Sequence, residues 1–193
     1  VTNSGTITAA NRAINIENAN TIITNSGEIY GTDEKAINVT GNSATITNES
    51  EGTIRAGAAS PDDNDGSEVN AVIFDNPDDS NYNGTLENYG KITAAASTVK
   101  VGMENVVINN YSGATIQLTD DAGGTAAIQI SEDNATITNK GTITGTHAAI
   151  TTAVSSGGTS VGNLVALTAS NTMTSAELAS MDDITEGVIT ATI

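Results

Sequence analysis

The sequence predicts an all-β fold, a parallel β-solenoid of about six coils, each with about 22 residues and three short strands. Three observations support this: one phrase recurs six times, apolar and polar residues alternate within each copy, and strand- and turn-forming residues dominate. Aromatic residues make up only 3% of the chain, with no Trp and one Phe. A single coil cannot bury its own apolar face, so stability must come from stacking. We expect right-handed coils, the usual chirality of parallel crossovers.

The recurring phrase is an aliphatic residue two positions before an Asn, followed by a Gly and then an Ile. Its six copies lie at residues 1–7, 23–29, 46–54, 86–92, 108–116 and 137–143. The Asn residues of successive copies are separated by 22, 23, 40, 22 and 29 residues, so insertions lengthen some coils. A second phrase, Ala-Ile-x-Ile or a variant of it, follows each copy and supplies the third strand.

Four columns of equivalent residues follow from this repeat. Two are aliphatic and should form inward ladders: Val1, Ile23, Ile46, Leu86, Ile108 and Ile137; and Ile7, Ile29, Ile54, Ile92, Ile116 and Ile143. The Asn column is expected at a corner, where its side chains can bond backbone groups. The Gly column is expected where the chain needs a positive φ or a close backbone approach.

The phrases A-I-x-I and A-T-I-T-N-x-G-T-I resemble the passenger-domain repeats of autotransporter adhesins and filamentous-haemagglutinin-like exoproteins. The resemblance covers roughly residues 1–150. It implies export, surface display and adhesion or self-association, and it transfers no catalytic residue to this chain.

The chain is strongly acidic, with 6 Lys and Arg against 23 Asp and Glu and a net charge of −17. Such a surface repels phosphate backbones and anionic lipid headgroups, which argues against nucleic-acid and membrane-surface partners. No cysteine is present, and no apolar run approaches the length of a membrane span. An acidic, cysteine-free solenoid fits a prokaryotic exoprotein. Because the chain starts at Val1, we expect a processed mature form or a fragment of a longer solenoid.

Three acidic insertions interrupt the period, at residues 57–68, 75–84 and 119–125. Carboxylates and carbonyls are the ligands that Ca²⁺ prefers, so all three insertions are candidates for a divalent-cation site. The candidate ligands are Asp62, Asp63, Asp65, Glu68, Asp120 and Asp121. Pro61 stands where a calcium loop would place its first Asp, and the alternative is a loop that charge keeps solvated.

The sequence does not predict an enzyme, and no cofactor other than calcium is suggested. The only histidine, His147, lies beside a regular coil with no acid or serine in a recognisable motif. The alternative function is a carbohydrate-active β-helix enzyme of the polysaccharide lyase or glycosidase type, which needs clustered carboxylates or a basic residue on one face. Ice binding is disfavoured because charged and aromatic residues interrupt the outward Thr columns, for example Glu28 and Tyr30.

Residues 151–193 carry no clear copy of the phrase and are expected to form a cap or a subunit-exchange segment. A capping box at residues 174–177 predicts one helical turn, and residues 188–193 are strand-like. If copies join head to tail, Val1 would meet the strand of a neighbour that contains Val188, Ile189 and Ile193.

The function predicted from the sequence is therefore a secreted or cell-surface structural or adhesive protein. It would self-assemble head to tail into extracellular filaments and contact a host or matrix glycan or protein. No nucleic-acid partner and no membrane insertion are expected.

Overall fold

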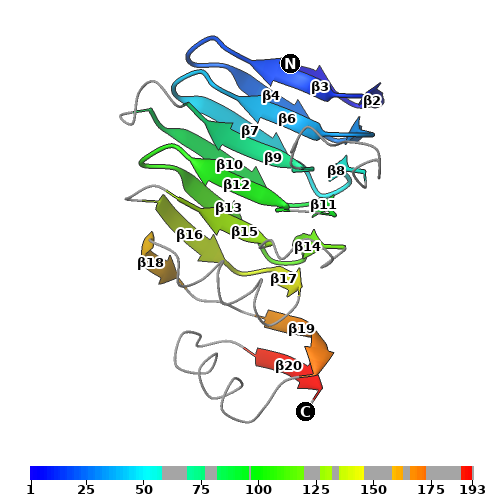
Figure 1. Cartoon of the computed structure of the whole chain (residues 1–193), viewed down its shortest axis with the longest axis vertical. Helices are drawn as coiled ribbons and strands as arrows, with labels where there is room; N and C mark the ends of the chain where they lie inside the picture. The colour runs from blue at the N-terminus through cyan, green and yellow to red at the C-terminus, as the bar shows by residue number, and fades with distance from the viewer. Residues whose placement is uncertain are drawn as a thin grey trace.

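The computed structural model describes residues 1–57, 69–76, 82–95, 97–119, 127–131, 135–145, 158–162, 166–172 and 188–192. These residues form a parallel β-solenoid of about five turns, with about 25 residues per turn (Figure 1). The predicted fold class is confirmed. The mean turn is longer than the basic repeat because the insertions are averaged into it. Among the described residues no helix is long and apolar enough to cross a membrane.

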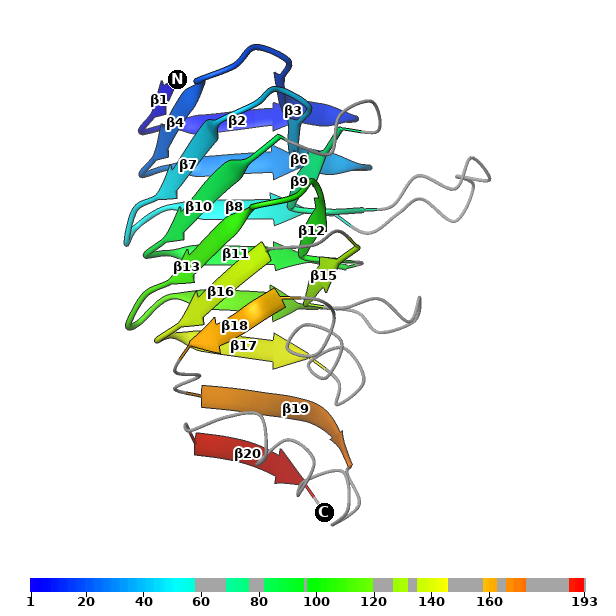
Figure 2. The same ribbon diagram turned by 90° about the vertical axis from the view of Figure 1, so that its left-hand side faces the viewer.

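Three parallel sheets run along the solenoid, and each of the first five coils contributes one strand to each sheet (Figure 2). The first sheet contains β1 (Thr2–Asn3), β4 (Ile22–Asn25), β7 (Ala44–Asn48), β10 (Gly84–Asn88), β13 (Val107–Asn110), β16 (Ala135–Asn139) and β18 (Gly158–Gly162). The second contains β2 (Thr6–Ala9), β5 (Glu28–Gly31), β8 (Thr53–Ala56), β11 (Lys91–Ala94), β14 (Thr115–Leu118), β17 (Thr142–Gly145), β19 (Ala166–Thr172) and β20 (Val188–Thr192). The third contains β3 (Arg12–Ile16), β6 (Lys35–Val39), β9 (Val72–Asp75), β12 (Val99–Gly102) and β15 (Ile128–Ile130).

The two aliphatic columns predicted from the sequence line the interior of the stack. Ile46 pairs with Leu86 in the first sheet, and Ile54 pairs with Ile92 in the second. From Ile23 and Ile29 onward, every member of both columns is at most 1% exposed. Val1 differs because it is 60% exposed in the first coil. Strict alternation therefore directs one apolar side chain per strand into a shared core at each level.

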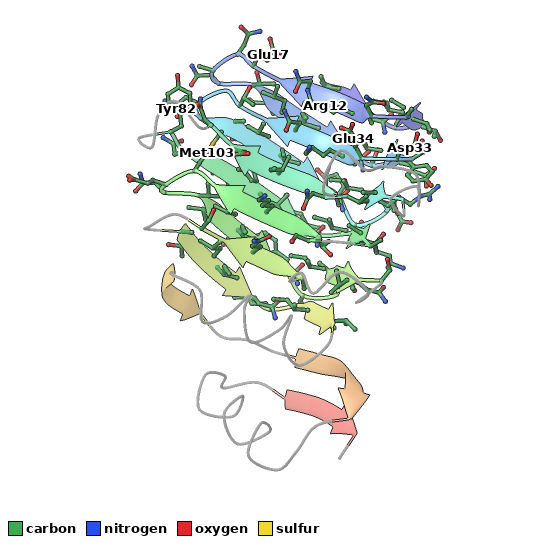
Figure 3. The ribbon with its side chains drawn as sticks, viewed as in Figure 1. Arg12, Glu17, Asp33, Glu34, Tyr82 and Met103 are labelled. Atoms are coloured by element: carbon green, nitrogen blue, oxygen red, sulfur yellow. The ribbon has the colours of Figure 1, made fainter. Side chains whose placement is uncertain are left out.

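The third sheet and the corner that follows it close the core with larger side chains. Phe74 and Met103 are fully buried, and Tyr82 packs partly against the same core. Figure 3 labels Tyr82 and Met103 on the side where the third sheet returns to the first. These residues fill space that the aliphatic columns leave, which explains why the core contains the few aromatic residues that it does.

The three corners of the coil differ in length. The first corner, between the first and second sheets, is short in every coil from Asn3 to Thr142. The second, between the second and third sheets, receives the insertions at 57–68 and 119–125, and the third receives the insertion at 75–84. At the third corner Asn20, Ser43 and Asn105 adopt φ values of 55–58° at equivalent positions. Small polar residues tolerate this left-handed conformation best, and it turns the chain into the next strand.

The carboxyl segment adds strands to two of the sheets. Strand β18 pairs with β16, so that Val161 lies opposite Ile137. Strand β19 pairs with β17, so that Leu167 lies opposite Ile143, and β20 pairs with β19. Val161 and Leu167 thus take register positions that continue those of Ile137 and Ile143. The helical turn expected at residues 174–181 lies outside the described residues.

Candidate functional site

The predicted calcium ligands all lie outside the described residues: Asp62, Asp63, Asp65, Glu68, Asp120 and Asp121. The same is true of His147. The topology does bear on the loops that contain these ligands, because 57–68 joins β8 to β9 and 119–125 joins β14 to β15, at the same corner two coils apart. Calcium binding stays a prediction. Within the described ranges no group of three or more His, Cys, Asp or Glu side chains could hold a metal ion.

The residues predicted to mediate assembly lie near the two ends of the described stack. The amino group of Val1 donates a hydrogen bond of 2.7 Å to the carbonyl oxygen of Ile22, and Ile22 itself is 62% exposed. Val188 and Ile189 lie on β20 and pair with Ala166 and Leu167 of β19 in the same chain. Ile193 lies outside the described residues.

The first corner contains a continuous ladder of asparagine side chains. The Nδ2 group of each Asn donates to the Oδ1 atom of the Asn in the next coil, at 2.6–2.9 Å. The six members are Asn3, Asn25, Asn48, Asn88, Asn110 and Asn139, and all are buried. Most Nδ2 groups also donate to a backbone carbonyl of the following turn, for example Asn88 to Thr115 at 3.2 Å. The ladder satisfies polar atoms that the tight corner removes from water.

The glycine column packs against this ladder. A Cβ atom on Gly90 would lie 2.3 Å from the carbonyl oxygens of both Glu49 and Gly52, a distance that backbone atoms cannot tolerate. Close approach therefore explains the column at most levels, whereas Gly113 has a φ of +86°. Both reasons were expected from the sequence.

Outside the ladder, the residue after each Asn forms an exterior column along the corner. The backbone N–H of such a residue donates to the carbonyl oxygen of the ladder Asn in the preceding coil, for example Tyr89 to Asn48 at 2.7 Å and Tyr111 to Asn88 at 2.9 Å. The six members are Ser4, Ser26, Glu49, Tyr89, Tyr111 and Lys140. The scaffold fixes where this column runs and leaves the identity of its side chains free.

In the two coils of β10 and β13, four exterior side chains form a cluster that we call the tyrosine patch: Glu87, Tyr89, Asn109 and Tyr111. The rings of Tyr89 and Tyr111 are stacked, with centroids 4.1 Å apart and planes inclined by 1°. The Glu87 carboxylate accepts a 2.6 Å hydrogen bond from the Tyr111 hydroxyl and a 3.0 Å bond from Asn109 Nδ2. The patch is thus a rigid aromatic and carboxylate surface on the outside of the solenoid.

The charge distribution of the patch is set by these bonds. Donation to the Glu87 carboxylate, together with a hydrogen bond to Tyr89 and partial desolvation, raises the pKa of Tyr111 well above its ordinary value. Tyr111 therefore stays neutral at physiological pH, and its hydroxyl group orients the Glu87 carboxylate. Tyr89 remains 40% exposed although Tyr111 covers one face of its ring.

A second cluster, which we call the arginine cluster, lies on the outward face of the second sheet: Glu28, Tyr30 and Arg55. The Arg55 guanidinium carbon lies 3.3 Å from the centroid of the Tyr30 ring. Arg55 Nε also donates to the Glu28 carboxylate at 2.6 Å. The ring and the carboxylate are both engaged by a cation from the chain itself.

Sequence reasoning missed the tyrosine patch, although a signal was present. The residues on either side of the Asn are Thr and Ser at Asn3 and Asn25, but Glu and Tyr at Asn88 and Asn and Tyr at Asn110. An alignment of the six copies would have exposed these departures. That they form one cluster depends on the stacking of β10 on β13.

Comparisons with known proteins found no matching family model, no matching curated protein and no matching solved structure.

Proposed function

We propose that this protein is an extracellular, surface-displayed structural or adhesive solenoid. The observation that carries the proposal is the difference between the inside and the outside of each coil. The interior columns stay aliphatic or asparagine in every coil, whereas the exterior side chains vary. The ladders of aliphatic and asparagine side chains build a stiff scaffold, on which single substitutions in the exterior columns create contact surfaces at no cost to the core. The likeness of the repeat phrases to autotransporter and filamentous-haemagglutinin-like passenger repeats supports export and display.

The net charge of −17 supports the same proposal, because it keeps a densely displayed protein soluble and disfavours nucleic acids and anionic membranes as partners. We also propose head-to-tail association into filaments. The exposed side chains of Val1 and Ile22 in the first two coils support this, since they offer apolar contact area beside strands that pair in parallel register. Calcium bound by the acidic insertions would relieve repulsion between neighbouring copies.

Negative-stain imaging of the purified chain, with calcium and with a chelator, tests the proposal. We expect slender particles that join end to end, with more joining when calcium is present. The variant Ile22→Lys should shorten the assemblies, whereas the control Gln117→Lys, which adds the same charge on another sheet, should not. A chain that stays monomeric at millimolar concentration with calcium contradicts filament formation. Turnover of any polysaccharide would contradict the structural reading and favour a carbohydrate-active enzyme.

A further inference from the structure

The tyrosine patch departs from the repeat at four positions in two adjacent coils, and the fold requires none of these departures. The coil that contains Thr24 and Ser26 pairs in the same parallel register as the coils of the patch. Thr and Ser at these positions therefore satisfy the scaffold. Glu87, Tyr89, Asn109 and Tyr111 are better explained by a contact that the patch makes with another molecule.

The arginine cluster indicates what kind of contact this is. There, a guanidinium lies over a tyrosine ring and donates to a glutamate of the neighbouring coil. The tyrosine patch presents the same two kinds of acceptor, an aromatic face and a carboxylate. The groups of the patch that donate to Glu87, the Tyr111 hydroxyl and the Asn109 amide, carry no charge. In the arginine cluster the cation that engages these acceptors is Arg55, through its ion pair with Glu28 and its cation–π contact with Tyr30.

The exterior column shows where a cation would sit. Tyr111 covers the face of the Tyr89 ring that looks toward the later coils, so the other face looks toward the coil of Glu49. Glu49 follows Asn48, the register partner of Asn88, and is exposed. A planar cation over this face of Tyr89 would lie between the ring and the coil of Glu49. In the arginine cluster, Glu28 and Tyr30 lie two residues apart in the chain, as Glu87 and Tyr89 do, and Arg55 contacts both from the neighbouring strand.

We propose that the Tyr89 face of the tyrosine patch, with Glu49 and Glu87, binds an arginine side chain of a basic segment on a partner protein. Arginine fits better than lysine because its flat guanidinium stacks on a ring while it donates to carboxylates at its edge. The net charge of −17 attracts such a segment and repels anionic ligands. This inference deepens the proposed adhesive function and rests on it, because it names the partner chemistry of one exterior surface.

The test is a titration of the full chain with the peptide Gly-Arg-Gly-Arg-Gly amide, followed by the NMR signals of the Tyr ring protons. Two control peptides replace Arg with citrulline, which keeps the shape but loses the charge, and with Lys, which keeps the charge but loses the planar fork. We expect saturable shifts of the Tyr89 and Tyr111 signals with the Arg peptide, weaker binding of the Lys peptide and none of the citrulline peptide.

Two substitutions return the column to the serine of the first coils and should leave the fold intact. Tyr89→Ser and Glu49→Ser should each weaken binding at least about threefold, the range expected for an exposed cation–π contact or a charge-assisted bond. Glu51→Ser is the matched control, since it removes another exposed carboxylate two residues away and should weaken binding less. Equal binding of the citrulline peptide, no binding of the Arg peptide, or unchanged affinity in Tyr89→Ser would each overturn the inference. The negative-stain experiment tests particle shape and end-to-end joining, which depend on other surfaces. A peptide titration without binding would therefore overturn this inference and leave the proposed function standing.

Discussion

Two columns of the first corner are one residue apart in the sequence and differ in almost every physical respect. The asparagine column is buried and identical in all six copies of the phrase. The column directly after it is serine, serine, glutamate, tyrosine, tyrosine and lysine, and most of its members are exposed. Both columns are spaced by the same backbone hydrogen bonds from coil to coil.

The difference teaches that stacking constrains only the side chains that it encloses. An enclosed amide must meet an identical amide above and below, because any other residue breaks two contacts at once. A side chain on the outside meets solvent and can change from coil to coil. On a solenoid of this kind, function is therefore to be sought in the exterior positions that vary, and stability in the interior positions that do not.

The largest effect should come from interrupting the asparagine ladder at its centre. Asn88→Ala removes the bonds of Asn88 to Asn48, Asn110, Thr115 and Gly90, and takes from the buried Asn110 Oδ1 atom and the Gly90 N–H the partner that Asn88 supplies. Because each such atom costs about 1–3 kcal/mol, we expect a loss of at least about 3 kcal/mol in the free energy of unfolding by urea.

Asn3→Ala is the matched control, because Asn3 receives no hydrogen bond from a preceding amide of the ladder. We expect a smaller loss there. If Asn88→Ala and Asn3→Ala lose the same free energy of unfolding, the ladder does not act cooperatively.

The next largest effect should come from the glycine column. Gly90→Ala places a methyl group against two backbone carbonyls at 2.3 Å, and we expect a cost of about 1–3 kcal/mol from the forced shift of the corner. Gly5→Ala meets nothing within 4 Å and should change the free energy of unfolding far less. Thermal melts of both variants by circular dichroism make the measurement. Similar melting temperatures would contradict close packing as the reason for this column.

A smaller effect is expected on the exterior, where the Tyr111 hydroxyl donates to Glu87. The pKa of Tyr111 is raised in the folded chain, so the bond stabilises the fold fully below the pKa of an unfolded tyrosine, about 10. The contribution is lost as the pH rises through the higher folded-state pKa. Tyr111→Phe should cost about 1 kcal/mol at neutral pH and should abolish the highest-pH step in an ultraviolet titration of the tyrosines. Persistence of that step in the variant would assign it to another tyrosine.

The smallest effect should come from the arginine cluster. The side chains of Arg55 and Glu28 are 38% and 34% exposed, so water and salt screen their attraction. Arg55→Thr restores the residue that Thr93 provides in the next coil, and we expect a change between about 0 and 1 kcal/mol. Chemical denaturation at low and high salt measures it. A loss above about 2 kcal/mol in the free energy of unfolding would show that exterior columns also stabilise the fold.

The sequence by itself determined the columns of the scaffold. A repeat of about 22 residues with alternating aliphatic residues, an Asn and a Gly can be satisfied only if equivalent residues stack, and each column then has one role. The buried aliphatic ladders, the asparagine corner and the close approach at Gly90 were all predictable for this reason.

Tertiary structure decided what the period does not encode. Glu87 and Tyr111 lie 24 residues apart and bond only because β10 and β13 pair in one register. Strands β18 and β19 pair in register with β16 and β17, so that Val161 lies opposite Ile137 and Leu167 opposite Ile143, in a segment without a clear copy of the phrase. The physical reason is the same in both cases. Strand pairing is a contact between backbones, so it tolerates departures in the sequence, and it alone determines which distant exterior side chains become neighbours.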